Sequence, residues 1–146
     1  MRRPRSDRGI IRIGEPAISL LRAEIAGQNR PAMTDVLRNL ATACDKIGIV
    51  CPARATVYKL IDTIEVRSYS LNSLPAAAAK ALYNLARGSR VPGRQVVFYC
   101  LNYGDLDAVC FAASLPWLDL WQALRMRGWR PKSRGLLEAV CRTRRI

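Results

Sequence analysis

Apolar residues recur at helical spacing along most of this chain, and proline or glycine interrupts the pattern before any helix becomes long. Between Pro16 and Gly27 the apolar positions share one helical face, and the same holds between Thr34 and Gly48. The two stripes are Ile18, Leu21 and Ile25, then Val36, Leu37, Leu40 and Cys44. This spacing predicts amphipathic helices that bury one face. The predicted fold is mostly α, with a short strand or wing as the one other element.

Residues with strong positional preferences predict where these helices begin and end. Thr34 is expected to be the N-cap of the second helix, and Gly48 its end. A third helix is expected over 54–64, with Pro52 near its first turn, where a missing N–H costs nothing. Residues 65–75 alternate irregularly, which indicates an extended connector or a short strand.

The second half of the chain predicts further helices. Residues 75–88 are rich in alanine and begin with proline, which favours a helix. In residues 91–105 strand and helix are close to equal by pattern, and helix is favoured because a proline precedes the apolar run and a glycine follows it. Residues 106–129 are expected to form two helices separated at Ser114–Leu115. A last helix is expected to start at Ser133 as its cap.

Positive charge is the strongest compositional feature. The formal net charge is +13, from 24 Lys and Arg against 11 Asp and Glu. Most of this excess lies in residues 1–16 and 125–146, while the interior is closer to neutral. Clustered cations favour a docking surface for a polyanion, with nucleic acid as the first candidate and an anionic membrane surface as the second. A generally basic composition without a polyanionic partner is the alternative.

The sequence also constrains the cellular setting. No apolar run is long enough to span a bilayer, and the first residues lack the apolar core of a secretory signal, so no membrane-spanning segment is expected. The predicted partners do not include a membrane. The five cysteines form an odd set without close pairing, which does not resemble an extracellular disulfide framework. We expect a reduced, cytoplasmic, bacterial protein whose cysteines act as small apolar residues.

The helix expected over 54–64 has two different faces. Val57, Leu60, Ile61 and Ile64 point toward a core. The opposite face carries Arg54, Ala55, Tyr58, Lys59 and Asp62. A helix fits the DNA major groove with its N-terminal residues nearest the bases, and its N-terminus favours phosphate. The alternative is an ordinary surface helix that happens to carry these cations.

The stretch Ala53–Ile61, ARATVYKLI, resembles the recognition helix of helix-turn-helix proteins, notably the DNA-binding domains of serine resolvases. In those domains a similar Arg-Ala-Thr-Val-Tyr run follows a tight turn, whereas here Ile49–Pro52 make the connection longer. The resemblance covers about a dozen residues, or about thirty with the preceding helix. It implies the binding mode only, without a resolvase catalytic domain. From the exposed face of this helix, the expected DNA contacts are Arg54, Ala55, Thr56, Tyr58 and Lys59.

A second pair of helices, over 106–123, is also similar to a helix-turn-helix, but its outer face is unsuited to DNA. That face would present Trp117, Leu118 and Trp121. Exposed apolar side chains of this size suit a protein partner or a dimer seam better than base edges. The alternative, given equal weight, is that the tryptophans are ordinary core residues.

Both ends of the chain are predicted to hold backbone phosphates. Residues 1–15 are expected to be a flexible basic arm that contacts DNA through Arg2, Arg3 and Arg5. The corresponding residues of the tail are Arg125, Arg127, Arg130, Lys132 and Arg134. Trp129 lies among these cations and would stack on a base or brace a phosphate-binding loop. Phosphate contacts add affinity without sequence information and weaken with salt.

Catalytic and metal-site signals are weak. The chain has no histidine, which removes the usual general base and most zinc-site designs. It has no glycine-rich phosphate loop, and Asp105, Asp107 and Asp119 are too dispersed to predict a nuclease metal site. We therefore expect no enzyme activity, no metal and no cofactor.

These observations predict three segments and one leading function. The segments are the arm over 1–15, a helix-turn-helix DNA-binding unit over 16–70, and a helical unit over 71–146 for dimerisation or partner binding. The leading hypothesis is a homodimeric, sequence-specific regulator of transcription that binds double-stranded DNA, such as an autoregulating antitoxin, a repressor, or a regulator on a mobile element. The alternatives are a protein-interaction module that neutralises or scaffolds a partner such as a toxin, and a protein that binds structured RNA.

Overall fold

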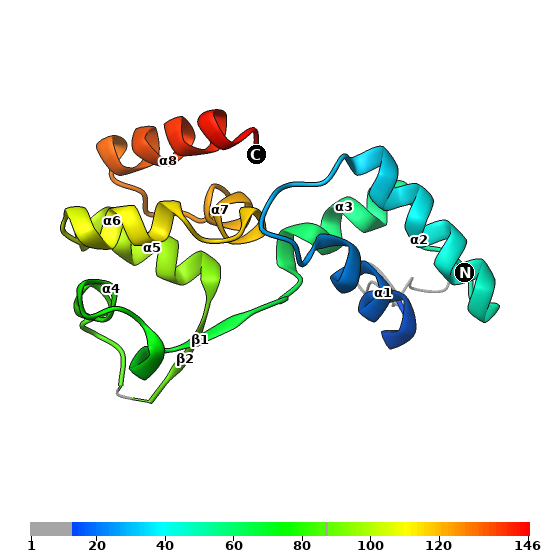
Figure 1. Cartoon of the computed structure of the whole chain (residues 1–146), viewed down its shortest axis with the longest axis horizontal. Helices are drawn as coiled ribbons and strands as arrows, with labels where there is room; N and C mark the ends of the chain where they lie inside the picture. Colours follow the sequence, from blue (N-terminus) through cyan, green and yellow to red (C-terminus); the bar gives the residue numbers. More distant parts are fainter. Residues whose placement is uncertain (1–12, 87) are drawn as a thin grey trace, which may run out of the picture.

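The computed structural model describes residues 13–86 and 88–146 and confirms a mostly α fold with one small sheet. Two lobes lie side by side in Figure 1, with α1–α3 in one and α4–α8 in the other. The N-terminal lobe contains α1 (Glu15–Ile25), α2 (Met33–Ile47) and α3 (Arg54–Thr63). The C-terminal lobe contains α4 (Ala76–Ala81), α5 (Gly93–Tyr103), α6 (Leu106–Ala113), α7 (Trp117–Ala123) and α8 (Pro131–Arg144). Within the described ranges, no helix combines the length and apolar character needed to cross a membrane.

The helices of the N-terminal lobe bury the predicted apolar stripes. Leu21 and Ile25 of α1, Leu40 of α2, and Val57 and Ile61 of α3 are all buried in one core. The backbone of α2 ends at Gly48, whose φ of 72° is left-handed, and its N–H donates to the carbonyl of Asp45. Glycine adopts this conformation without the steric cost that a side chain adds. The predicted end of α2 is confirmed.

The C-terminal lobe has a core of its own, centred on α5. Val96, Val97 and Cys100 of α5 are fully buried between α4, α6 and α8. The helix favoured for residues 91–105 is confirmed. Its apolar run packs against several neighbouring helices, which explains why the sequence shows no polar face there. The predicted break at Ser114–Leu115 is also confirmed, since α6 ends at Ala113 and α7 begins at Trp117.

A short antiparallel sheet packs on the C-terminal core, and its first strand follows the segment that leaves α3. Strand β1 (Ser68–Ser70) pairs with β2 (Arg90–Pro92), so that Tyr69 lies opposite Val91. A short 3-10 turn, η1 (Leu71–Ser73), follows β1 directly. The predicted connector or short strand over 65–75 is therefore confirmed, and Figure 1 shows the sheet running beside the start of α5.

Three predicted helix boundaries are wrong. The helix α2 begins at Met33 with Ala32 as its N-cap, so Thr34 lies inside the first turn and makes no capping bond. The helix α8 begins at Pro131, and the Ser133 hydroxyl instead donates to the carbonyl of Leu101, 2.9 Å away. The alanine-rich helix α4 ends at Ala81 rather than near residue 88. At Ser133 a tertiary hydrogen bond replaces the predicted capping role.

The helix α7 inserts into the N-terminal lobe, which corrects the prediction that its apolar residues form a surface for a partner or dimer. Trp117 and Leu118 are 0% and 3% exposed, and both pack among the residues of α1–α3. The Trp117 indole Nε1 donates to the carbonyl of Ile25, 3.1 Å away, and its backbone N–H donates to Gln28. The alternative of core tryptophans is confirmed for Trp117.

Truncating Trp117 is expected to destabilise the whole protein. Trp117→Ala removes the largest side chain of the N-terminal core and leaves the Ile25 carbonyl without its donor. Large-to-small changes of this kind cost about 3–5 kcal/mol. We expect this loss in the free energy of unfolding measured by urea denaturation. Leu106→Ala is the control, because Leu106 is 75% exposed and its truncation should cost less than about 0.5 kcal/mol. Equal effects of the two substitutions would contradict the inserted position of α7.

Candidate nucleic-acid interface

The outward edge of α3 carries the side chains that the sequence predicts for DNA contact. Arg54, Ala55 and Lys59 are exposed, whereas Thr56 and Tyr58 are half-buried. The helix begins at Arg54 because Pro52 and Ala53 hold the preceding backbone extended. Ala53, the N-cap, makes no side-chain capping bond. Free backbone N–H groups and a guanidinium group therefore lie together at the start of α3.

Two arginines that the sequence did not single out lie beside this edge. Arg30 and Arg145 line a hollow of about 360 Å³ together with Tyr58 and the first turn of α2. Arg30 comes from the α1–α2 connection, and Arg145 follows the last residue of α8. Their separation along the chain explains why no local pattern predicts them. The hollow brings a phenol and two guanidinium groups to one place on the surface.

The neighbouring Arg144 fixes the chain end that carries Arg145. Its Nη1 donates to the carbonyls of Ala113 and Leu115, at 2.9 and 2.6 Å, and its Nη2 donates to Gln28 at 3.2 Å. These bonds hold the end of α8 against both lobes. Arg145 itself stays exposed at the hollow.

Asp62, the acidic residue of α3, is neutralised by side chains at the C-terminal end of the helix. The carboxylate of Asp62 accepts from Arg125, with Nε and Oδ1 2.7 Å apart, and from the Trp121 indole at 3.2 Å. Arg54 and Lys59 form no ion pair with any residue in the described ranges. The first two turns of α3 are therefore cationic, while its last turn is joined to α7.

Trp121, the third residue predicted for a partner surface, is half-buried against arginines. The guanidinium groups of Arg30 and Arg125 lie 4.5 and 4.0 Å from its ring centroid. Its indole N–H is bound by Asp62. The Trp121 ring is therefore occupied by contacts within the molecule, and Arg30, which lies over it, also lines the hollow beside Tyr58.

Of the tail residues predicted to bind DNA, Arg125 lies against α3 through its pair with Asp62, whereas the others are not gathered around this helix. Arg130 and Arg134 lie at the start of α8, which Figure 1 places at the far end of the C-terminal lobe. Arg134 pairs with Glu138 at 3.1 Å, while Arg127 and Lys132 are exposed. Trp129 packs on Phe98 and donates to the carbonyl of Ala123, which fits a bracing role rather than an open stacking surface. Arg2, Arg3 and Arg5 lie outside the described residues.

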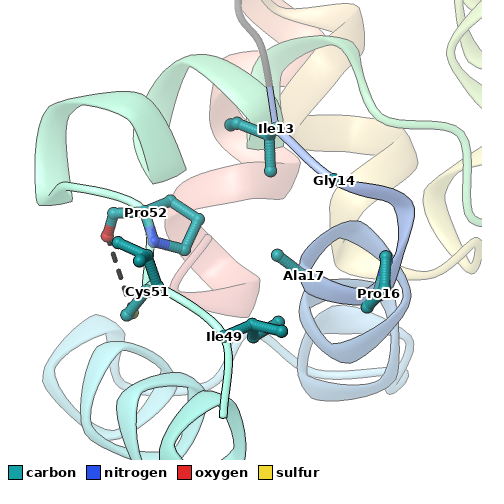
Figure 2. A pocket seen from close by; sticks show the side chains of 8 residues that line it. Ile13, Gly14, Pro16, Ala17, Ile49, Cys51 and Pro52 are labelled. Atoms are coloured by element: carbon teal, nitrogen blue, oxygen red, sulfur yellow. Dashed lines mark hydrogen bonds between the residues drawn. The ribbon is translucent and has the colours of Figure 1, made fainter. Parts of the chain in front are cut away.

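An apolar hollow lies on the other side of the connection between α2 and α3. It has a volume of about 420 Å³ and is lined by residues of the α1 start and of the connection. Figure 2 shows Ile13 and Ala17 on one side and Ile49 and Cys51 on the other. Burial and the nearby Cys51 raise the pKa of the Cys44 thiol of α2. With this apolar lining, the hollow does not suit phosphate.

Asp119 is a buried carboxylate away from the α3 edge. It is 6% exposed and accepts from the Tyr69 hydroxyl at 2.9 Å. Gly93 packs so closely on this carboxylate that a Cβ would lie 2.0 Å from it, so only glycine fits. Burial raises the pKa of Asp119 to about 6, although Tyr69, Arg67 and Arg94 act in the opposite direction. The group acts as an interior contact between the sheet and α7.

Among the residues that the structure describes, no group of three or more His, Cys, Asp or Glu side chains is placed to hold a metal ion. Comparison of the chain with protein-family models, with curated proteins and with solved structures finds no match.

The buried Asp119 predicts a pH dependence of stability. Its pKa is about 6 in the folded protein and near 3.8 when it is unperturbed, so between these values the folded state holds a proton that the unfolded state releases. This carboxyl therefore makes folding more favourable as pH falls from 7 to 4, by roughly 2–3 kcal/mol.

Asp119→Asn, which is uncharged at every pH, should remove this contribution. Relative to the wild type, the unfolding free energy of Asp119→Asn should therefore fall by roughly 2–3 kcal/mol as pH falls from 7 to 4, because only the wild type gains stability from protonation of this carboxyl. Asp107→Asn, at an exposed position, provides the matched control and should leave the dependence intact. A difference that stays constant with pH would mean that the Asp119 carboxyl is not perturbed by burial.

Proposed function

We propose that this protein binds double-stranded DNA through the cationic edge of α3. In this arrangement α3 lies in the major groove, Arg54 contacts guanine, and Thr56 and Tyr58 contact phosphate or a thymine methyl. Lys59, Arg30 and Arg145 hold backbone phosphates beside the groove. Ala55, a small residue, allows close approach of the helix to the bases.

One observation carries the proposal. The first two turns of α3 present cations without acidic partners in the described ranges, whereas the acid of the same helix is bound by Arg125 and Trp121. Exposed cations in one cluster repel each other, and a polyanion relieves that repulsion. Arg30 and Arg145 add to the cluster from segments distant in sequence. The net charge of +13 acts in the same direction by attracting DNA from a distance.

A role in transcription follows from this binding mode as part of the proposal. A helix with Arg54 at its start reads base edges as well as phosphates, which suits a repressor, an autoregulating antitoxin or a regulator on a mobile element. Proteins that read DNA with one short helix commonly bind as dimers to two half-sites. A homodimer of this chain and a toxin partner are therefore included as proposals.

The alternative functions have less support. An interaction module that captures a partner through Trp117, Leu118 and Trp121 lacks an accessible surface, since the first two residues are buried and arginines lie over the ring of the third. Structured RNA has a deep, narrow major groove that a helix does not enter, so the α3 edge suits B-form DNA better. Competition between duplex DNA and structured RNA for the protein distinguishes these two polyanions.

Removing the two exposed cations of α3 is expected to weaken duplex binding. The double variant Arg54→Ala with Lys59→Ala should bind a pool of DNA duplexes at least roughly tenfold more weakly, because one base contact and one phosphate contact are lost. The slope of log affinity against log salt should fall by about 1–2. Fluorescence anisotropy titrations at several salt concentrations measure both quantities.

The matched control is Lys46→Ala with Arg142→Ala, which removes the same charge from exposed positions on α2 and α8. This control should change duplex affinity much less. If both double variants weaken binding equally, the DNA is attracted by net charge alone and α3 is not the interface.

A further inference from the structure

Two tyrosines lie exposed at the end of the molecule that is distant from α1–α3. Tyr83 follows α4 and is 74% exposed, and Tyr103 ends α5 and is 44% exposed. Figure 1 places these helices at the opposite end from α2 and α3. The two rings are 6.4 Å apart and meet edge to face, with planes at 89°. At 74% exposure, the Tyr83 ring keeps a face open to a ligand.

A guanidinium group is held against this tyrosine pair. Arg130 lies 4.6 Å from the ring centroid of Tyr103. Its Nη1 donates to the carbonyl of Asn102 at 3.1 Å, and its backbone N–H donates to the Asn102 side chain at 3.1 Å. Asn102 is buried, so it anchors Arg130 firmly. Arg130 thus presents a preorganised flat cation on Tyr103, the ring that Tyr83 also contacts.

A hollow next to the pair adds a second cation. It has a volume of about 330 Å³ and is lined by Lys80, Tyr103 and their neighbours on α4 and the α5–α6 connection. Lys80 is exposed and forms no ion pair within the described ranges. The acid in this hollow, Asp105, caps α6 by accepting from the Ala108 N–H at 3.0 Å. Asp107 is the other acid of the first turn of α6.

We propose that this surface, formed by Lys80, Tyr83, Tyr103 and Arg130, binds unpaired bases of a single-stranded nucleic acid. A base stacks on the open face of Tyr83 or on the Arg130 guanidinium, and Lys80 contacts the adjacent phosphate. Aromatic and guanidinium planes beside cations are the groups that hold single strands. In a duplex each base face is covered by its neighbours, so this surface selects unpaired nucleotides.

The chemistry favours a nucleic acid over a protein partner at this surface. In a nucleic acid the bases stack on the rings and the phosphates contact the cations, so both kinds of group are used. An apolar protein surface would leave Lys80 and Arg130 without acidic partners. The site lies away from α3 and does not depend on the duplex-binding proposal. RNA and DNA share the stacking chemistry, and the experiment below separates these two sources.

The test measures binding of the full chain to labelled oligo-dT and oligo-U of about 12 nucleotides by fluorescence anisotropy. Tyr83→Ala should weaken binding roughly fivefold or more, the loss expected for one stacked base. Tyr83→Phe keeps the ring and should bind as the wild type does. Leu106→Ala removes an exposed apolar side chain at the same end and should also leave binding unchanged. Tighter binding of oligo-U than of oligo-dT would identify RNA as the ligand. Tighter binding of oligo-dT would identify DNA, and equal affinity would mean that the surface binds single strands of both kinds.

Several results would overturn this inference. Wild-type affinity for both oligonucleotides in Tyr83→Ala would do so, as would an equal loss in Tyr83→Phe or in Leu106→Ala. The double variant Arg54→Ala with Lys59→Ala separates the two proposals, because it should lose duplex binding and keep oligonucleotide binding. If it loses the oligonucleotides while Tyr83→Ala keeps them, single strands bind at α3, and the second site does not exist.

Discussion

The indole of Trp117 fills the core of the N-terminal helices although it belongs to α7, and the arrangement of the two lobes depends on this insertion. Three short helices have little apolar surface to bury by themselves, and small units of this size are marginally stable alone. Trp117 and Leu118 enlarge that core from outside. The Gln122 amide adds two hydrogen bonds, to the carbonyls of Ile61 and Ile64 at 2.8 Å. The lobes are therefore coupled at the end of α3.

The same contacts that join the lobes also shape the charge of the candidate interface. Asp62 would place a carboxylate on α3, but Arg125 and Trp121 bind it from the α7 side. Arg30, which lies over the ring of Trp121, also lines the hollow beside Tyr58. A change at α7 would therefore alter both stability and the electrostatic character of α3. Stability and binding should be measured together in any variant of this region.

The sequence predicts most of the helices, because short amphipathic segments between glycine and proline are local properties. It also predicts that α3 begins at Arg54 and buries Val57 and Ile61. It fails where the decisive contact is distant. The sequence pattern around Trp117 fits a surface position and a core position equally well, since only the fold brings α1 within reach of its indole. Arg30 and Arg145 escape prediction for the same reason, because they are 115 positions apart in the numbering and meet at one hollow.

Cations that are close together in the sequence are separated when the chain folds. The tail appears continuous in the sequence, yet α8 separates Arg130, at its start, from Arg145, at its end, and carries them to opposite ends of the C-terminal lobe. Arg145 thus joins the α3 edge, while Arg130 stacks on Tyr103 far from it. Because α7 and the Arg144 bonds fix one lobe against the other, the two cationic surfaces are held at a set separation. Under the two proposals made above, a nucleic acid that combines a duplex with an unpaired segment would contact both surfaces, and binding at one would raise the effective concentration at the other.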